Sequence, residues 1–253
     1  MSKPVPVHER SSLLALVLLL VGSTWLVQGA LADSTSSRPT LHPKSAPPWT
    51  QTSTGAGIRT FKRELPGSDV IALRGIGIVA APIVRVASVL LDYTRAPEWI
   101  DSLEFVRVVR MVGPLEFIEH DHVGTPPLIM KDRDFVCRGK LALDLAEQSL
   151  VMTIEPATDP SVPPDDSCVR GELRGYWKLK AINGGKHTLV TAEMHGDPKG
   201  GVPKWLVNLF QKGWARSTIE ALRAQVAKPD IKIMPQVEAA FEGKPIDLAI
   251  KSE

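Results

Sequence analysis

The residues best suited to chemistry in this chain are two histidines, His120 and His122, which stand two positions apart. In a β-strand such residues point to the same face, so the two imidazoles could act together as metal ligands. A zinc site needs at least three protein ligands, and no third residue stands at a convincing spacing. We therefore expect no metal site and predict that the histidines are exposed or hydrogen-bonded on a strand.

Charged residues also stand together at Arg133-Asp134 and on both sides of a turn at His195 and Asp197. Each pair has groups that could transfer protons or bind a polar molecule. The alternative, which we favour, is that each pair fixes the adjoining loop. The chain lacks the G-x-S-x-G, H-E-x-x-H, C-x-x-C and G-x-x-x-x-G-K motifs. The sequence therefore predicts no catalytic residue and no cofactor.

The two cysteines, Cys137 and Cys168, are too few for a structural zinc site but could form a disulfide in an oxidising compartment. The predicted strand order places them two strands apart, a separation of about 10 Å that a disulfide cannot span. A bridge would require Cys168 to lie on a mobile loop. The sequence leaves both the bridged and the free state open.

Residues 1–32 have the pattern of a signal peptide. Two basic residues precede an apolar run from Leu13 to Val21, and Ala30-Leu31-Ala32 is a suitable cleavage site. We expect cleavage after Ala32 and export to the periplasm or out of the cell. The alternative is an uncleaved membrane anchor over residues 13–27.

Loss of this segment removes Lys3, Arg10 and Glu9 and changes the formal net charge from +2 to +1. A nearly neutral chain offers no electrostatic basis for binding nucleic acid. Residues 33–48 are rich in Ser, Thr and Pro and are predicted to form a flexible linker. The rest of the chain is long enough for one large core.

Alternating apolar and polar residues predict a strand-rich domain beyond the linker. A helix is expected from Pro82 to a point before Pro97, and an exposed proline-rich loop at Thr158–Ser167. Turns such as Pro66-Gly67 and Asn183-Gly184-Gly185 indicate antiparallel pairing. The predicted strands are Ile58–Leu65, Val70–Ala80, Phe105–Met111, Leu115–Val123, Phe135–Leu145, Ser149–Glu155, Val169–Lys180 and Lys186–Met194.

The strand pattern changes to a helix pattern after Met194. Pro198 and Gly200-Gly201 end strand pairing, and apolar residues then return every three or four positions from Val202 to Val226. We expect one long helix here, with an apolar face that covers the sheet. Residues 229–253 are predicted to form a C-terminal tail, an appendage with a short helix near Gln236–Phe241.

Five short segments resemble, in this order, those of the START lipid-transfer domain of the helix-grip superfamily. They are Gly57–Arg63, Leu73-Arg74-Gly75, Asp92–Trp99, Arg133–Val136 and Asp197–Asn208, within a domain of residues 49–228. The resemblance implies an α+β helix-grip fold, a curved antiparallel sheet wrapped around a long C-terminal helix with an apolar cavity. It also implies one bound lipid or sterol.

The candidates for lining this cavity or its lid are aromatic, aliphatic and polar residues, each of which could instead be ordinary core packing. They are Trp99, His120, Arg133, Phe135, Trp177, Leu206, Leu209 and Phe210. The resemblance also implies, for steroid-binding members, a buried acid and a buried arginine in the tunnel. Their places fall near His120 and Gly139 here, so steroid specificity does not carry over.

We expect an exported, non-enzymatic carrier of a hydrophobic ligand (lipid, sterol or fatty acid) that meets a membrane surface transiently. One alternative is a helix-grip enzyme, a cyclase or hydrolase, with His120, His122 and Arg133 converging on an apolar substrate. Another is a lipid-binding module tethered through residues 13–27. The Thr158–Ser167 loop and the glycines at Gly200-Gly201 are the predicted points of ligand entry.

Overall fold

The computed structural model describes residues 42, 44, 46–125 and 130–244. These residues belong to one unit, residues 37–253. The predicted signal peptide, the alternative anchor and most of the predicted linker lie outside the described residues. Within the described part, no helix combines the length and the apolar character needed to cross a membrane.

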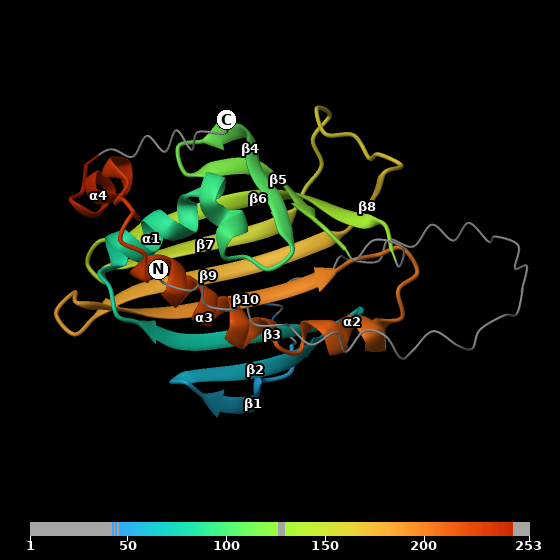
Figure 1. Cartoon of the computed structure of the whole chain (residues 1–253), viewed down its shortest axis with the longest axis horizontal. Helices are drawn as coiled ribbons and strands as arrows, with labels where there is room; N and C mark the ends of the chain where they lie inside the picture. Colours follow the sequence, from blue (N-terminus) through green and yellow to red (C-terminus); the bar gives the residue numbers. More distant parts are fainter. Residues whose placement is uncertain (1–41, 43, 45, 126–129, 245–253) are drawn as a thin grey trace, which may run out of the picture. The chain divides into compact units, whose positions relative to one another are not determined.

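A ten-stranded sheet forms the body of this unit, in the order β1-β2-β3-β10-β9-β7-β6-β5-β4 (Figure 1). All neighbours are antiparallel except β8, which pairs with β6 in parallel. The strands are β1 (Thr50–Gly55), β2 (Ile58–Leu65), β3 (Ser68–Val79), β4 (Leu103–Gly113), β5 (Glu116–Val123), β6 (Asp132–Asp144), β7 (Ser149–Pro156), β8 (Cys168–Arg170), β9 (Glu172–Ile182) and β10 (His187–Asp197).

The predicted hairpin turns are confirmed by their backbone. Gly67 between β2 and β3 has φ +78°, and Asn183 and Gly184 between β9 and β10 have φ +54° and +66°. Asparagine and glycine tolerate this left-handed region better than other residues, so these sequences select tight turns.

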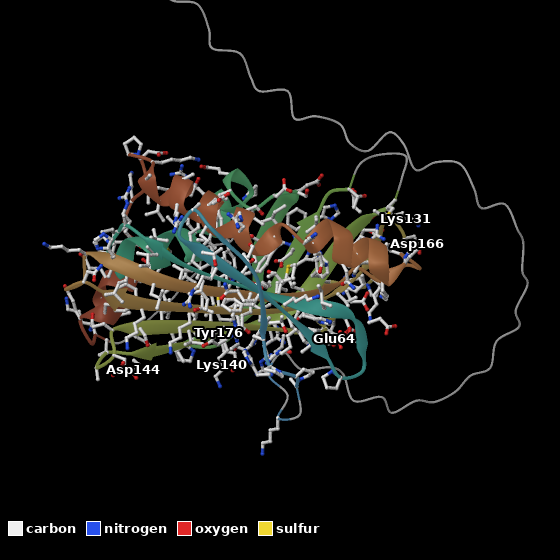
Figure 2. All side chains as sticks on the ribbon, turned by 90° about the horizontal axis from the view of Figure 1, so that it is seen from below. Glu64, Lys131, Lys140, Asp144, Asp166 and Tyr176 are labelled. Atoms are coloured by element: carbon white, nitrogen blue, oxygen red, sulfur yellow. The ribbon has the colours of Figure 1, made fainter. Side chains whose placement is uncertain are left out.

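The helices lie mainly on one face of the sheet (Figure 1). They are α1 (Ile83–Leu91), the 3-10 helix η1 (Tyr93–Glu98), α2 (Lys204–Gln211), α3 (Trp214–Ala227) and α4 (Pro235–Phe241). We call the side of the sheet that α1 and α3 cover the helix face and the opposite side the outer face. Figure 2 shows Lys140 and Tyr176 on the outer face, away from α2 and α3.

The prediction of one long helix over Val202–Val226 is wrong. The structure has two helices, because α2 ends at Gln211 and α3 begins at Trp214. Gly213 stands at the break, where a residue without a side chain weakens a continuous helix by about 1 kcal/mol relative to alanine.

Helix α3 packs directly on the backbone of β3. Ile219 and Leu222 are fully buried and face the sheet at helical spacing. A Cβ at Gly75 would lie 2.4 Å from the carbonyl oxygen of Ala215. The glycine is therefore required by the close approach of the helix.

The C-terminal tail is not an appendage over its described part. The predicted short helix is present as α4. Its Val237 is buried in the same core as α1, and Phe241 packs against that core. Arg85 of α1 fixes the connection from α3, because its guanidinium donates to the carbonyls of Val226, Lys228 and Ile231 at 2.9, 2.7 and 3.1 Å.

Both cysteines are free. The expected two-strand separation is wrong, since β8 pairs directly with β6. Cys168 lies opposite Asp132, while Cys137 lies five residues further along β6. That register separates them by about 16 Å along the strand, far more than a disulfide can span.

Candidate ligand-binding site on the helix face

Alternation along β5 and β6 decides which side chains face the helices. Directly opposed residues of neighbouring strands share a face. Phe117 lies opposite Gly139 and packs in the core under the helices, which sets the odd-numbered residues on the helix face. The opposed pairs on that face are Phe117–Gly139, Glu119–Cys137, Asp121–Phe135 and Val123–Arg133.

Arg133 lies at one end of this row and holds the segment that leads into α2. Its side chain is 5% exposed, and its guanidinium donates to the carbonyls of Pro198 and Lys131. Gly200 packs so closely that a Cβ there would lie 3.4 Å from Nη2 of Arg133. Arg133 therefore fixes the loop before α2, as the structural interpretation of the sequence predicted.

Helix α2 is attached to the sheet by polar side chains. Asn208 accepts from the backbone N–H of Ile71 at 3.1 Å and donates to the carbonyl of Asp69 at 3.2 Å. Gln211 donates to the carbonyl of Gly196 at 2.8 Å. The side chains of Trp205, Leu206, Leu209 and Phe210 lie outside the described residues, so the roles of Leu206, Leu209 and Phe210 in the lid stay predictions.

Left-handed backbone precedes α2. Lys199, Gly200 and Gly201 have φ values of +54°, +68° and +74°. The chain thus carries a glycine pair before α2 and Gly213 after it, and both are positions where the backbone can change direction at low cost. Helix α2 is a separate short element with a glycine-containing segment on each side.

Two acids occupy the middle of the row. Glu119 is 2% exposed and Asp121 is 8% exposed, and their oxygens lie with the sulfur of buried Cys137 inside a cluster no wider than 4.8 Å. Tyr93 of η1 donates its hydroxyl to Oε2 of Glu119 at 2.6 Å. The Oδ1 atom of Asp121 is buried and has no hydrogen-bond partner among the described residues.

Burial changes the protonation of this cluster. It raises the pKa of Glu119 to about 7, although the hydrogen bond from Tyr93 acts in the opposite direction. Burial and the charge of Glu119 raise the pKa of Asp121 well above its usual range. Burial and the same two acids raise the pKa of the Cys137 thiol. The cluster therefore holds protons at pH values where surface carboxylates have lost theirs.

Aromatic side chains form part of the core on the helix face. Trp99 and Trp177 meet edge to face with ring centroids 6.2 Å apart, and Tyr93 and Phe117 do the same at 6.0 Å. Phe135 is 9% exposed and belongs to the same core. The structure thus brings together three predicted lining residues, Trp99, Phe135 and Trp177.

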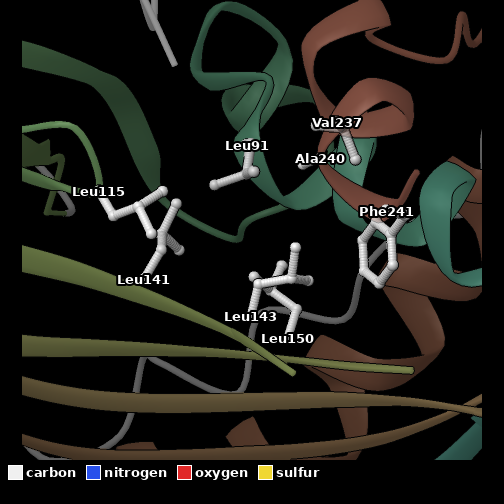
Figure 3. A pocket seen from close by; sticks show the side chains of 8 residues that line it. All are labelled: Leu91, Leu115, Leu141, Leu143, Leu150, Val237, Ala240 and Phe241. Atoms are coloured by element: carbon white, nitrogen blue, oxygen red, sulfur yellow. The ribbon is translucent and has the colours of Figure 1, made fainter. Parts of the chain in front are cut away.

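The far end of the helix face is entirely apolar. A cavity of about 20 Å³ lies there between α1, β6, β7 and α4 (Figure 3). This is about the room that one water needs. Its lining consists of Leu91, Leu115, Leu141, Leu143, Leu150, Val237, Ala240 and Phe241. The helix face therefore runs from a polar end near α2 to a closely packed apolar end at α4.

His120 does not face this site, and its prediction as a lining residue is wrong. It lies on the outer face, where its imidazole contacts Asp134 at 3.2 Å and Arg107 at 3.3 Å. His122 is on the same face, 3.5 Å from Glu104 and 3.6 Å from Asp132. The strand was predicted correctly, but the sequence analysis expected even-numbered residues of β5 to face the pocket. The odd-numbered residues face the helices instead.

Glu119 and Asp121 were missed by the sequence analysis for the same reason. They flank His120, and a shift of one residue exchanges the two faces of a strand. The available signal was Phe117: a large apolar residue two positions before Glu119 marks the buried parity.

The fold separates Arg133 from Asp134 but leaves His195 and Asp197 on the same face of β10. Arg133 lies on the helix face, whereas Asp134 lies on the outer face and pairs with Arg170 at 2.6 Å. His195 contacts Ser68 at 2.9 Å, and Asp197 pairs with Lys204 at 2.6 Å. Each charge thus has a structural partner from another element.

The Thr158–Ser167 loop lies against the outer face. Val162 is buried with Ile118 and Val136, two outer-face residues. Asp159 is 6% exposed and pairs with Arg110 at 2.7 Å. This loop is anchored on the side away from the acids, which leaves the segment around α2 as the predicted entry point.

The antiparallel sheet, with α1 and α3 on one face, defines a helix-grip fold. Human STARD10 has this fold with a TM-score of 0.65 at 17% sequence identity, over 72% of this chain and 74% of that chain. A fragment of the STAR-related lipid transfer protein from Xanthomonas axonopodis has the same fold with a TM-score of 0.62 at 23% sequence identity. The match covers 71% of this chain and 99% of that chain.

The START domain family model matches residues 43–228, more than half of the chain. The protein belongs to the START domain family. An uncharacterized protein of Pseudomonas aeruginosa is 22% identical over 178 residues, which cover 68% of this chain and 83% of that protein.

Proposed function

We propose that this protein binds one hydrophobic ligand, a lipid, sterol or fatty acid, on the helix face of its sheet and carries it between membranes. The observation that carries the proposal is the core of aromatic and aliphatic side chains on the helix face, which includes Trp99, Phe135 and Trp177, together with the short helix α2 that polar contacts attach to the sheet. Membership of the START family and the fold shared with proteins named as lipid transfer proteins support it.

The affinity would come mainly from apolar burial. At about 25 cal/mol per Å², removing some 300 Å² of apolar ligand surface from water contributes about 7 kcal/mol. The apolar end of the helix face is already packed, with a cavity of only about 20 Å³. Binding a whole lipid therefore requires space near α2, which opens when α2 moves.

Helix α2 is the element best placed to move. Its contacts through Asn208 and Gln211 are hydrogen bonds to strand backbone, and the same groups can bond to water when the helix swings out. The glycine pair before it and Gly213 after it supply the joints. Opening at a membrane surface would let the ligand exchange without unfolding the sheet.

An enzyme remains the second candidate. The convergence of His120, His122 and Arg133 required by the sequence hypothesis does not exist, because the histidines lie on the outer face. The observation that favours catalysis is the pair Glu119 and Asp121, buried acids with raised pKa values. A cyclase or hydrolase would chemically change a bound ligand, whereas a carrier returns it unchanged.

The decisive experiment separates these outcomes. The purified protein is extracted with organic solvent, its ligands are identified by mass spectrometry, and transfer of labelled lipids between vesicles is measured. We expect a defined lipid in stoichiometric amount and transfer above the spontaneous rate. An empty protein that moves no sterol, phospholipid or fatty acid contradicts the carrier function, and a converted product supports the enzyme.

We also propose export, with cleavage after Ala32, on the basis of the N-terminal sequence pattern. The alternative is tethering through residues 13–27. N-terminal sequencing of the protein from its own host decides between them. A mature start at Asp33 supports export, and an intact N-terminus in the membrane fraction supports the tether.

A further inference from the structure

The buried acids on the two faces of the sheet differ in their counter-charges. On the outer face, Glu193 pairs with Arg74 at 2.6 Å, Asp134 with Arg170 at 2.6 Å and Asp159 with Arg110 at 2.7 Å. Each of these buried carboxylates is thus neutralised by a guanidinium. Burying a carboxylate without such a partner is costly.

On the helix face, no described arginine, lysine or histidine contacts Glu119 or Asp121. The groups that face them are the Tyr93 hydroxyl from η1 and the Cys137 thiol from β6, and the two carboxyls face each other. Neither the hydroxyl nor the thiol carries positive charge. Among the described residues, the two acids therefore have no positively charged partner, and each stays neutral only while it holds a proton.

One carboxyl oxygen is open to a new partner. Oδ1 of Asp121 is buried without a hydrogen-bond partner among the described residues. Asp121 lies opposite Phe135, one step closer to Arg133 and the α2 end than Glu119 does. A ligand group that enters the helix face at its α2 end would contact Asp121 before it contacts Glu119.

We infer that the ligand of this protein carries a protonated amine on a hydrophobic body, and that the amine lies between Asp121 and Glu119. An ammonium group supplies the missing charge and donates up to three hydrogen bonds, to Oδ1 of Asp121 and to the Glu119 carboxylate. The aromatic rings of Trp99, Phe117 and Trp177 then contact the apolar body. This assignment rests on the proposed carrier function and specifies its ligand class.

Three probes with the same twelve-carbon chain test the assignment: dodecylamine, dodecanol and dodecanoate. Each is titrated below its micelle concentration, with tryptophan fluorescence and calorimetry as readouts. We expect dodecylamine to bind about tenfold or more tighter than dodecanol, which is the size of one charge-assisted hydrogen bond, and dodecanoate to bind weakest.

Variants locate the effect. Asp121→Asn and Glu119→Gln keep the shape of each side chain and should each reduce the affinity for dodecylamine about tenfold, with dodecanol affinity unchanged. Glu155→Gln, an acid on the outer-face side of β7, is the matched control and should change neither. Circular dichroism and thermal melts confirm that each variant is folded.

The pH dependence provides a further readout. Because burial raises the pKa of Glu119 to about 7, with Tyr93, Asp121 and Cys137 facing it, more of this acid is ionised at pH 8 than at pH 6. Dodecylamine, which stays protonated over this range, should bind more tightly at pH 8. Dodecanol binding should stay constant.

The outcomes separate the two proposals. Equal binding of amine and alcohol, or an amine preference that survives in both variants, overturns the amine assignment and leaves the carrier function standing. Failure of all three probes and of extracted lipids overturns both. Zinc binding that Cys137→Ser abolishes, without any amine preference, would replace the amine assignment by a metal site.

Discussion

The outer face and the helix face of this sheet both bury acids, but they treat them differently. Outer-face acids such as Glu193 and Asp134 form ion pairs with arginines from neighbouring strands. Burial alone would raise the pKa of Asp134, yet Arg170 keeps it below its usual value. Helix-face acids have raised pKa values and no described basic partner. These outer-face acids have guanidinium partners, whereas Glu119 and Asp121 have none among the described residues.

The largest expected effect comes from breaking an outer-face pair. Arg74→Ala leaves Glu193, with its side chain 1% exposed, without its guanidinium and also removes the contact of Arg74 with the Trp49 ring. We expect a loss of about 3 kcal/mol in the free energy of unfolding, measured by urea denaturation. Arg74→Lys, which keeps the charge, should lose less. A loss below about 1 kcal/mol would show that the outer-face pairs are not needed.

Glu119→Gln tests the opposite behaviour on the helix face. An acid whose folded pKa is raised, here from 4.5 to about 7, loses stability as pH rises through that window, because the folded state holds more protons than the unfolded one. The variant should therefore exceed the wild type by about 2 kcal/mol at pH 8 and match it near pH 4. A Glu119→Gln variant that is less stable than the wild type at pH 8 would contradict the raised pKa of Glu119.

His195 on the outer face should respond to pH in the reverse sense. Burial, followed by the charge of Arg174, lowers its pKa from 6.5 to about 4. The unfolded state then holds more protons between those values, so stability is lost as pH falls from 6.5 to 4. His195→Gln should reduce this acid sensitivity by about 1 kcal/mol, seen in unfolding curves at pH 4.5 and pH 7. Parallel curves for the variant and the wild type would exclude this role.

Tyr93→Phe is expected to have a smaller effect. It removes the hydroxyl that donates to Glu119, at a cost of about 1 kcal/mol. The cost should be larger at pH 8 than at pH 5, because the ionised carboxylate is the stronger acceptor. Tyr176→Phe on the outer face is the matched control. Equal costs at both pH values would mean that Glu119 does not titrate in this range.

Asn208→Ala should have the smallest effect on the free energy of unfolding but a large effect on the rate of ligand transfer. Loss of its two contacts with β3 is expected to cost about 0.5 kcal/mol, since water replaces them. Ligand transfer between vesicles should become several times faster, because α2 opens more often. Ser217→Ala on α3 should leave transfer unchanged. Slower transfer in Asn208→Ala would show that α2 is not the moving element.

The sequence predicted most of the fold because its signals are local. Pro66-Gly67 and Asn183-Gly184 define turns whatever surrounds them, and the long alternating runs define strands. The break at Gly213 was not predicted. Apolar residues continue across it at helical spacing, and the glycine there is a weaker signal than that periodicity.

The site was predicted less well for two reasons. It depends on which alternate residues of each strand face the helices, and on contacts between residues far apart in the sequence. Trp99, Phe135 and Trp177 are buried in the core on the helix face, and their role in lining a ligand cavity stays a prediction. His120 and Glu119 are neighbours in sequence, and the burial of Phe117 opposite Gly139 in the core under the helices shows that Glu119 faces them. That no described basic side chain contacts Asp121 is a property of the folded arrangement, which no short motif encodes.

The position of α4 also bears on where this domain can be cut. The family match ends at residue 228, yet Lys228 and Ile231 supply carbonyls to Arg85, and Val237, Ala240 and Phe241 cover leucines of β6 and β7. A fragment truncated at the family boundary would expose these leucines to water and would be prone to aggregate. The folding boundary lies beyond α4, so expression fragments and C-terminal fusions should retain residues through at least Lys244.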